Sequence, residues 1–270
     1  MSCLASMETW PGSPAGAAVL ADGTIERFGD TERPYQLASL TKLYTALAVL
    51  VAHEEGTLPL HDEVGPGYTA ADLLSHTAGF APDETRQIAE PRQRRIYSTG
   101  GYDVVASAVA ERAEMPFDEY AAAAVAQPLG MKSFTLTGSA GKDAQGSVED
   151  LLILAEEWAN PTLIDSRTHA NATLPYYGGL GGALPGYGTY NPNPWGMGPE
   201  IRGAKSPHWT AANNDPSTYG HFGRTGTMLW IDPVANTRTI ALNNIDFGPW
   251  ATSAWPPLSA SVLQASNRGG

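Results

Sequence analysis

The sequence predicts an α/β (α+β) fold with an antiparallel sheet flanked by helices. Two observations favour this class: strand patterns lie near both ends of the chain, at 15–30 and 225–244, and the segments between them are mostly helical. A chain of 270 residues with a hydrophobic fraction of 42% can bury a substantial core. We therefore expect one domain, 1–270, whose sheet is formed by the two ends of the chain.

The beginning of the chain predicts a hairpin and then a buried helix. Residues 15–23 and 24–30 are expected to form two short strands, because they meet at Asp22-Gly23, a frequent hairpin turn. Residues 39–55 predict a helix that a glycine ends. Its apolar side chains recur at helical spacing: Leu40, Leu43, Tyr44, Leu47, Leu50 and Val51.

The middle of the chain predicts further helices. A short helix is expected at 69–80, with Thr69 as its N-cap and Gly79 at its end. Two Ala-rich segments, 100–113 and 117–130, also predict helices.

The last part of the chain predicts a capped helix, a loop and a pair of strands. Ser147 opens a Ser-x-x-Asp capping box before an apolar segment. Residues 175–200 are dense in Gly, Pro and aromatic residues, which predicts an ordered loop. Strands are expected at 225–233 and 237–244, with a turn near 232–236.

Composition limits the partners and the compartment that we expect. Sixteen basic residues against 28 acidic ones give a net charge of −12, which argues against nucleic acid or an anionic membrane as a partner. A single cysteine, Cys3, allows no internal disulfide. The start of the chain lacks the features of a signal peptide, and the longest apolar run, 43–52, is too short to span a bilayer. These features predict a cytoplasmic protein and leave its oligomeric state open.

Ser39 and Lys42 are the strongest candidates for chemistry. On a helix, residues three apart lie on one face. A serine hydroxyl is a weak nucleophile until a base takes its proton, and a lysine with its solution pKa of about 10.4 is no base at neutral pH. Burial lowers a lysine pKa because desolvation disfavours the charged form. The pair therefore predicts an activated serine, and the alternative is an ordinary surface lysine near a helix start.

Other chemical frameworks are weaker or absent from the sequence. A second Ser-x-x-Lys, at Ser139 and Lys142, is followed by polar residues, so no buried helix is expected after it. No Gly-x-Ser-x-Gly elbow, Walker loop or Gly-x-Gly-x-x-Gly cradle occurs, and the six histidines lack metal-binding spacing. We expect no metal and no cofactor, and a small-molecule ester or amide as the partner.

Four segments together resemble the serine β-lactamase and penicillin-binding-protein superfamily. They occur in the family's order: SLTK at 39–42, LLSHTAGF at 73–80, YSTGGYDVVASAVAE at 97–111 and YGHFGRTGTMLWIDPVANTRTIALNN at 219–244. The nearest resemblance is to the branch of class C β-lactamases, D-amino-acid peptidases and β-lactamase-like esterases. It implies a β-lactamase/transpeptidase-like fold, with an α/β lobe at about 15–64 and 131–270 and a reduced helical lobe at about 65–130.

The resemblance implies catalytic roles for the matched residues. Ser39 matches the acylated nucleophile and Lys42 its partner lysine. Tyr97 matches the tyrosine that shuttles a proton between the serine and the leaving group. The backbone N–H groups of Ser39 and Arg224 match the oxyanion hole. We also expect a cationic lysine nearby to lower the Tyr97 pKa.

The resemblance also implies substrate-binding residues, with two departures from the family pattern. His221-Phe222-Gly223 falls where the family carries Lys-Thr-Gly or His-x-Gly, so a largely neutral histidine stands where class C β-lactamases hold the substrate carboxylate with a lysine. Thr99 replaces the Asn of the Tyr-x-Asn box, so an amide that would bind a substrate carbonyl is missing. His76 is implied to be structural.

The expected function is that of a serine hydrolase with an acyl-enzyme on Ser39, in the first place an esterase. An ester needs a nucleophile, an oxyanion hole and an apolar wall, whereas a β-lactam also carries a carboxylate; Arg224 is the feature that favours the β-lactam. The wall is expected from aromatic residues of the loop: Tyr176, Tyr177, Tyr187, Tyr190 and Trp195. The alternatives are a β-lactamase or D-amino-acid peptidase, and a catalytically weak or inactive binding protein.

Overall fold

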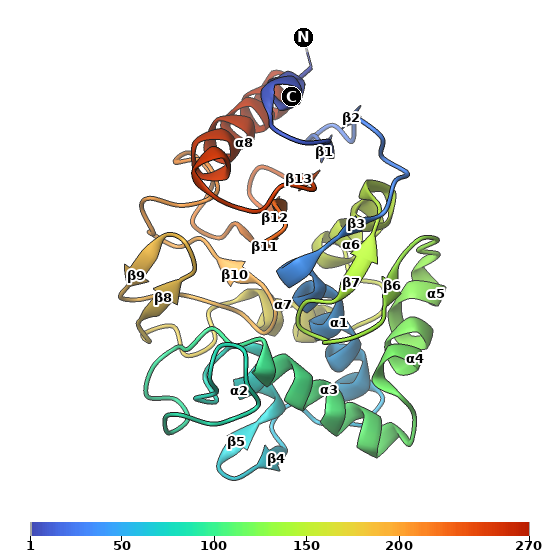
Figure 1. The fold of residues 1–270 in the computed structure, drawn as a ribbon, viewed down its shortest axis with the longest axis vertical. Coiled ribbons are helices and arrows are strands. Elements are labelled where there is room, and N and C mark those ends of the chain that lie inside the picture. The colour runs from blue at the N-terminus through green and yellow to red at the C-terminus, as the bar shows by residue number, and fades with distance from the viewer. Residues whose placement is uncertain (1, 270) are drawn as a thin grey trace.

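A six-stranded antiparallel sheet is the largest sheet of the protein, seen in a computed structural model that describes residues 2–269 (Figure 1). Its strand order is β10-β11-β12-β13-β1-β2. The two ends of the chain meet where β1 pairs with β13, which confirms the prediction. The strands are β1 (Ala15–Val19), β2 (Ile25–Phe28), β10 (Glu200–Ile201), β11 (Tyr219–Gly223), β12 (Thr227–Asp232) and β13 (Thr237–Leu242).

The two predicted hairpins are confirmed. β1 and β2 are joined by a turn in which Gly23 has a φ of +84°, a conformation that glycine adopts without steric cost. β12 and β13 are joined by a turn in which the Asp232 carboxylate accepts a hydrogen bond from the backbone N–H of Ala235 at 3.0 Å. Local turn chemistry therefore sets the register of both pairs.

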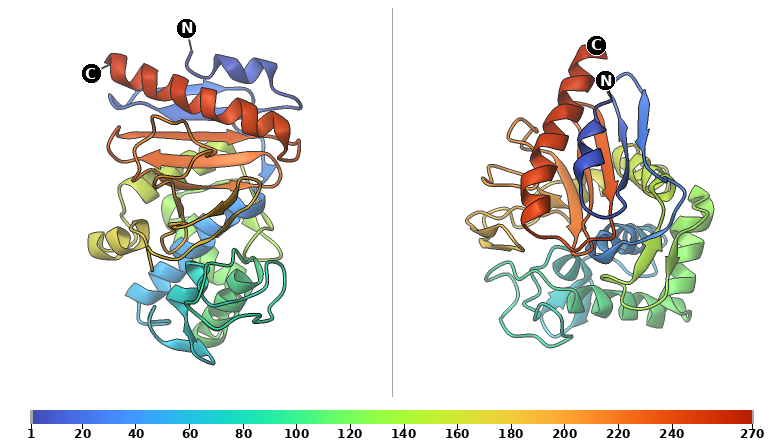
Figure 2. Two further views of the ribbon diagram at one scale, coloured as in Figure 1. Left: turned by 90° about the vertical axis from the view of Figure 1, so that its left-hand side faces the viewer. Right: turned by 45° about the horizontal axis from the view of Figure 1, so that its top comes forward.

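Side chains of the sheet alternate between two cores, because successive residues of a strand point to opposite faces. Leu229 and Ile231 face the core shared with α1 (Thr41–Glu54) and α6 (Val148–Ala159). Met228 and Trp230 face the core shared with η1 (Ala5–Thr9) and α8 (Pro249–Gly269). Figure 2 shows α8 and η1 lying together on one face of the sheet.

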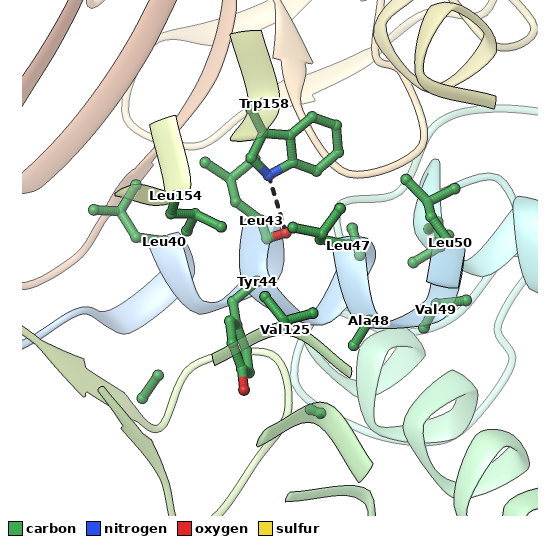
Figure 3. Close-up of a cluster of buried hydrophobic side chains, with 14 of the residues drawn as sticks. Leu40, Leu43, Tyr44, Leu47, Ala48, Val49, Leu50, Val125, Leu154 and Trp158 are labelled. Carbon is green, nitrogen blue, oxygen red and sulfur yellow. Dashed lines mark hydrogen bonds between the residues drawn. The ribbon is translucent and has the colours of Figure 1, made fainter. Parts of the chain in front are cut away.

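Helix α1 runs through the middle of the larger core. Every side chain from Thr41 to Ala52 is buried. Figure 3 shows leucines on one side of α1 and Tyr44 on the other, and the indole N–H of Trp158 donates a hydrogen bond to the carbonyl of Leu43 at 3.2 Å. A helix that is apolar all round is a buried helix, so the polar residue near its start, Lys42, is buried with it.

The predicted helices at 100–113, at 117–130 and after Ser147 are confirmed, and the one at 69–80 differs from prediction. The 69–80 helix is wrong in length: α2 ends at Leu74, because His76 has a φ of +62° and cannot continue it. The 117–130 helix is confirmed but contains one π-helical turn. The elements are α2 (Ala70–Leu74), α3 (Gly100–Ala113), α4 (Phe117–Ala121), η3 (Ala122–Ala126) and α5 (Gln127–Leu129).

Short elements complete the fold. The segment 175–200, expected to be an ordered loop, contains a small hairpin that was not predicted; its glycines allow the tight turn between the two strands. The remaining elements are η2 (Ala38–Leu40), β3 (Tyr35–Gln36), β4 (Glu63–Gly65), β5 (Tyr68–Thr69), β6 (Thr135–Leu136), β7 (Ala144–Gly146), α7 (Ser166–Thr173), β8 (Gly182–Leu184) and β9 (Gly188–Tyr190).

The architecture is thus the predicted one, with an antiparallel sheet covered by helices on both faces. The division into an α/β lobe and a helical lobe stays a prediction. Within residues 2–269, no helix combines the length and the apolar character needed to cross a bilayer.

Candidate active site

A cleft of about 570 Å³ lies where η2, the end of β11 and the start of α3 meet. Of the catalytic and substrate-binding residues predicted from the sequence, six line it: Ser39, Tyr97, Thr99, His221, Phe222 and Arg224. The structure therefore brings together residues that are up to 185 positions apart, counted from Ser39 to Arg224. Lys42 lies directly beneath the cleft and is completely buried.

Ser39 is held in the short helix η2, just before α1. The preceding residue, Ala38, has a φ of +47°, a left-handed conformation that costs about 1–3 kcal/mol in a residue other than glycine and is frequent at functional sites. The sheet supports this bend closely: a Cβ on Gly223 would lie 2.5 Å from the carbonyl oxygen of Leu37. Thr227 also donates its hydroxyl to that carbonyl, at 2.9 Å. Gly223 thus shapes the nucleophile segment through its missing side chain.

The Lys42 amine has three oxygen neighbours. Its Nζ lies 3.4 Å from Ser39 Oγ, 3.2 Å from Thr99 Oγ1 and 2.7 Å from the carbonyl oxygen of Gly141. A neutral amine has two N–H donors and one lone pair. With the two hydrogens on Gly141 and Thr99, the lone pair is left to face the Ser39 hydroxyl.

Burial lowers the pKa of Lys42 from 10.5 to about 7. Desolvation is the largest cause, and the nearby Lys142 lowers the pKa further. The carboxylates of Asp103 and Asp83 act in the opposite direction and raise it. A substantial fraction of Lys42 is therefore neutral at neutral pH and able to accept a proton.

Tyr97 lies against both Lys42 and His221. Its ring centroid is 4.8 Å from Lys42 Nζ, and its hydroxyl is 3.5 Å from His221 Nε2. Desolvation raises the Tyr97 pKa, and a hydrogen bond with Ser39 opposes this only in part. The expected lowering of the Tyr97 pKa is thus wrong. Lys42, with its pKa of about 7, loses its charge at a lower pH than that at which Tyr97 would ionise, so it does not offset the desolvation of the phenolate.

His221 is buried and neutral. Desolvation, followed by the charge of Lys42, lowers its pKa to about 3. Its Nδ1 lies 2.7 Å from the carbonyl oxygen of Phe222, so Nδ1 carries the hydrogen and Nε2 is left as an acceptor facing Tyr97. His221 therefore presents a hydrogen-bond acceptor at the cleft and no charge.

Thr99, Phe222 and Arg224 occupy three different parts of the cleft. Thr99 accepts a hydrogen bond from Lys42, so its hydroxyl faces the lysine as well as the cleft. Phe222 contributes to the apolar side. The Arg224 side chain is 86% exposed, with Asp246 as a distant partner at 4.0 Å, and it places a cation at the rim.

The apolar wall differs from the expected one. Of the five aromatic residues expected there, Trp195 lines the cleft. Tyr176 and Tyr177 do not line it, and their rings pack against each other at a centroid distance of 4.6 Å. Tyr190 lines a neighbouring groove instead, and Tyr187 packs against Phe222 at a centroid distance of 5.8 Å. The hairpin β8–β9 sets this arrangement. The wall is made of Leu184, Pro185, Trp195, Phe222 and Phe247.

The second Ser-x-x-Lys segment contributes to the site in a different way. Ser139 Oγ donates to the Asp103 carboxylate at 2.7 Å and does not line the cleft. Lys142 lines the cleft, and the carbonyl of Gly141 accepts from Lys42. Sequence analysis missed Gly141, because a backbone carbonyl leaves no signal in the residue type.

His76 packs against two aromatic residues that line the cleft. Its ring lies 4.6 Å from that of Tyr97 and 4.7 Å from that of Trp195, measured between centroids. Its Nδ1 accepts a hydrogen bond from the backbone N–H of Ser98 at 3.2 Å. Desolvation, then the charge of Lys42, holds its pKa well below the usual value. Among residues 2–269, no group of three or more His, Cys, Asp or Glu side chains is arranged to hold a metal ion.

The antiparallel sheet with its flanking helices, and the cluster of Ser39, Lys42 and Tyr97 beside strand β11, are those of a serine hydrolase of the β-lactamase and penicillin-binding-protein type. The chain belongs to the Beta-lactamase family, whose model matches residues 15–264.

Known proteins similar to this chain carry several activities in their names. A β-lactamase of Mycobacterium bovis is 40% identical, with a TM-score of 0.96 over 98% of this chain and 99% of that one. A protein of Salmonella gallinarum named "Putative D-alanyl-D-alanine carboxypeptidase" is 26% identical over 82% of this chain and 71% of its own. EstCE1, described as a hydrolase with promiscuous acyltransferase activity, is 18% identical with a TM-score of 0.77 over 97% and 96% of the two chains, a likeness of fold alone.

Proposed function

We propose that this protein is a serine esterase that forms an acyl-enzyme on Ser39. The observation that carries the proposal is the buried Lys42, whose pKa is lowered to about 7 and whose Nζ lies 3.4 Å from Ser39 Oγ. A base with a pKa close to the working pH is best suited to proton transfer. The arrangement supplies a nucleophile and its base without a histidine–aspartate pair.

The proposed acylation starts with a proton transfer from Ser39 Oγ to Lys42 Nζ as the oxygen attacks the ester carbonyl. The backbone N–H groups of Ser39 and Arg224 stabilise the oxyanion, each contributing about 3–4 kcal/mol in well-studied enzymes. Tyr97, which remains protonated, donates its phenolic proton to the departing alkoxide and is reprotonated from Lys42. Water then hydrolyses the acyl-enzyme with the same groups in reverse order.

The chemistry of the cleft favours an uncharged ester. The wall of Leu184, Trp195 and Phe247 is apolar. His221, with its pKa lowered to about 3, is uncharged at neutral pH, so it has no positive charge for a substrate carboxylate. An ester needs only the nucleophile, the oxyanion hole and the apolar wall.

A second candidate is a D-amino-acid peptidase or β-lactamase. Arg224 and Lys142 line the same cleft, and either cation is suited to a substrate carboxylate. The names of the Salmonella relative, a carboxypeptidase, and of the Mycobacterium protein, a β-lactamase, also favour this candidate. A catalytically inactive binding protein remains the third candidate, and the test below distinguishes it.

The test compares kcat/KM for p-nitrophenyl acetate and butyrate with that for a chromogenic cephalosporin and a D-alanyl-D-alanine peptide. Ser39→Ala is the blank. We expect the ester values to be higher, and an Arg224→Gln variant to keep them. A higher value on the cephalosporin or the peptide, lost in Arg224→Gln, would establish the second candidate. No turnover of any substrate above the blank, and no adduct by intact mass, would establish the third.

A further inference from the structure

We propose that Asp103 and Ser139 are positioning residues for Lys42, and that they act together through the backbone of Gly141. This inference rests on the proposed function, because it concerns the base of the same reaction. Neither side chain lines the cleft. Both line a separate groove.

A continuous chain of hydrogen bonds connects the pair to the lysine. Ser139 Oγ donates to Asp103 Oδ1 at 2.7 Å and accepts from the backbone N–H of Gly141 at 3.2 Å. The carbonyl oxygen of Gly141 accepts from Lys42 Nζ at 2.7 Å, the shortest of the three contacts of that amine. The Ser139 hydroxyl therefore donates a hydrogen bond to a residue of α3 and accepts one from the turn that faces Lys42.

The turn at 139–143 is fixed from several sides. The Asp143 carboxylate accepts from the backbone N–H of Ser139 at 2.8 Å, and Thr45 donates its hydroxyl to the carbonyl of Ala140 at 2.6 Å. At Gly141 a Cβ would lie 2.8 Å from Thr99 Cγ2, so glycine lets the turn approach the site closely. Only the bond to Asp103 attaches Ser139 to helix α3. Its removal frees the turn on that side.

The orientation of the amine gives this positioning a consequence for reactivity. A neutral amine directs its lone pair at Ser39 only while both hydrogens have fixed acceptors, and the Gly141 carbonyl is the nearer acceptor. A shift of the turn would let the amine rotate and would turn the lone pair away. Misplacement of a reacting group by about 1 Å costs up to roughly 100-fold in rate.

Several charged or titratable groups face Lys42, and they decide how its pKa changes when one of them is removed. Asp103 and Asp83 raise it, and Lys142 lowers it. The other neighbours, from α3, β11 and the segments before α3, are Tyr102, Tyr97, His221 and His76. Loss of the Asp103 charge thus lowers the pKa of Lys42 further, whereas loss of the Ser139 hydroxyl leaves every charge in place.

The experiment compares Ser139→Ala, Ser139→Thr, Asp103→Asn and the control Ser107→Ala, which removes a hydroxyl bonded to the Asp103 carbonyl on the outer side of α3. The first readout is kcat across pH on p-nitrophenyl butyrate. We expect Ser139→Ala to lower the plateau roughly 10- to 100-fold without moving the acidic limb. Asp103→Asn should lower the plateau to a similar degree and move the limb to lower pH. Ser139→Thr and Ser107→Ala should behave like the wild type.

The second readout does not need turnover. The chain has only four lysines, so the Lys42 signal of protein labelled with 13Cε-lysine can be assigned by its loss in Lys42→Met. Its titration midpoint should fall in Asp103→Asn and its chemical shift should change in Ser139→Ala. If the wild type forms no adduct on Ser39, but the Lys42 titration midpoint falls in Asp103→Asn and the Lys42 chemical shift changes in Ser139→Ala, the proposed function fails and the positioning stands. If Ser39 is acylated while Ser139→Ala and Asp103→Asn match the wild type in both readouts, the positioning fails alone.

Discussion

Replacement of Lys42 by methionine should change how the stability of the protein depends on pH. Methionine has a similar length and no charge, so the buried site stays filled. In the wild type the folded protein holds Lys42 with a pKa lowered from 10.5 to about 7. The unfolded chain therefore binds one more proton than the folded protein between these two values, and stability rises with pH across that range.

The magnitude follows from the size of the shift. Each pKa unit corresponds to about 1.4 kcal/mol, so burial of Lys42 costs roughly 5 kcal/mol below pH 7, and this cost disappears as the pH approaches 10.5. Between pH 7.5 and 9.5, the wild type should gain about 2.5 kcal/mol of unfolding free energy relative to Lys42→Met. Tyrosines with raised pKa values titrate in both proteins and cancel in the comparison. The three buried histidines, His76, His208 and His221, all have lowered pKa values and titrate below this window.

The assay is urea unfolding, followed by tryptophan fluorescence at pH 7.5 and 9.5, for the wild type and Lys42→Met. Lys132→Met is the matched control, because Lys132 is exposed; it should keep the wild-type dependence. An equal change with pH in the wild type and in Lys42→Met would refute the reasoning, since it would mean that the folded protein keeps Lys42 protonated throughout the window.

Four further predictions concern activity. The kcat/KM for esters should rise with pH along a limb near pH 7 and then level off, because Lys42 must be neutral to accept the serine proton, and a pH-independent rate would argue against a lysine base. A fluorophosphonate should add once to the wild type and not to Ser39→Ala, as intact mass would show; an adduct mapped to Ser139 would contradict the assignment, since that hydroxyl is bonded to a carboxylate behind the cleft. Tyr97→Phe should lower kcat about 100-fold, the typical cost of losing a proton-transfer group, and rates close to wild type would exclude the proposed role. Gly223→Ala should lower both the midpoint of thermal unfolding and kcat, because a Cβ there meets backbone at 2.5 Å; an unchanged kcat would show that the segment holding the nucleophile can move without consequence.

Local patterns in the sequence were sufficient for much of the secondary structure. The hairpin around Asp22-Gly23 and the capping box at Ser147 are settled by interactions within a few residues, and both are present in the structure. The end of α2 was not predictable in this way. His76 leaves the helix in a left-handed conformation because its ring packs between Tyr97 and Trp195, which come from distant parts of the chain.

The wall of the cleft, like the end of α2, depends on tertiary structure more than on local sequence. The residues expected at its wall were chosen for their aromatic character, and most of them lie elsewhere. For Tyr187 and Tyr190 the reason is the hairpin β8–β9, which turns both away from the cleft. Leu184 and Phe247 take their place at the wall. Residue type alone does not say which face of this hairpin lines the cavity, because glycines and tyrosines are spread along the whole segment.

The sequence by itself determined the order of the elements, the pairing of the two chain ends in one sheet, and the proximity of Ser39 to Lys42, because one helical turn separates the two residues. Tertiary structure alone decided the protonation of the site. Burial of α1 on all sides removes water from Lys42 and lowers its pKa to about 7, and the carbonyl of Gly141, 99 residues away, directs its hydrogens. Desolvation and hydrogen-bond direction depend on groups that are distant in the chain, and a pattern of residue types carries no record of them.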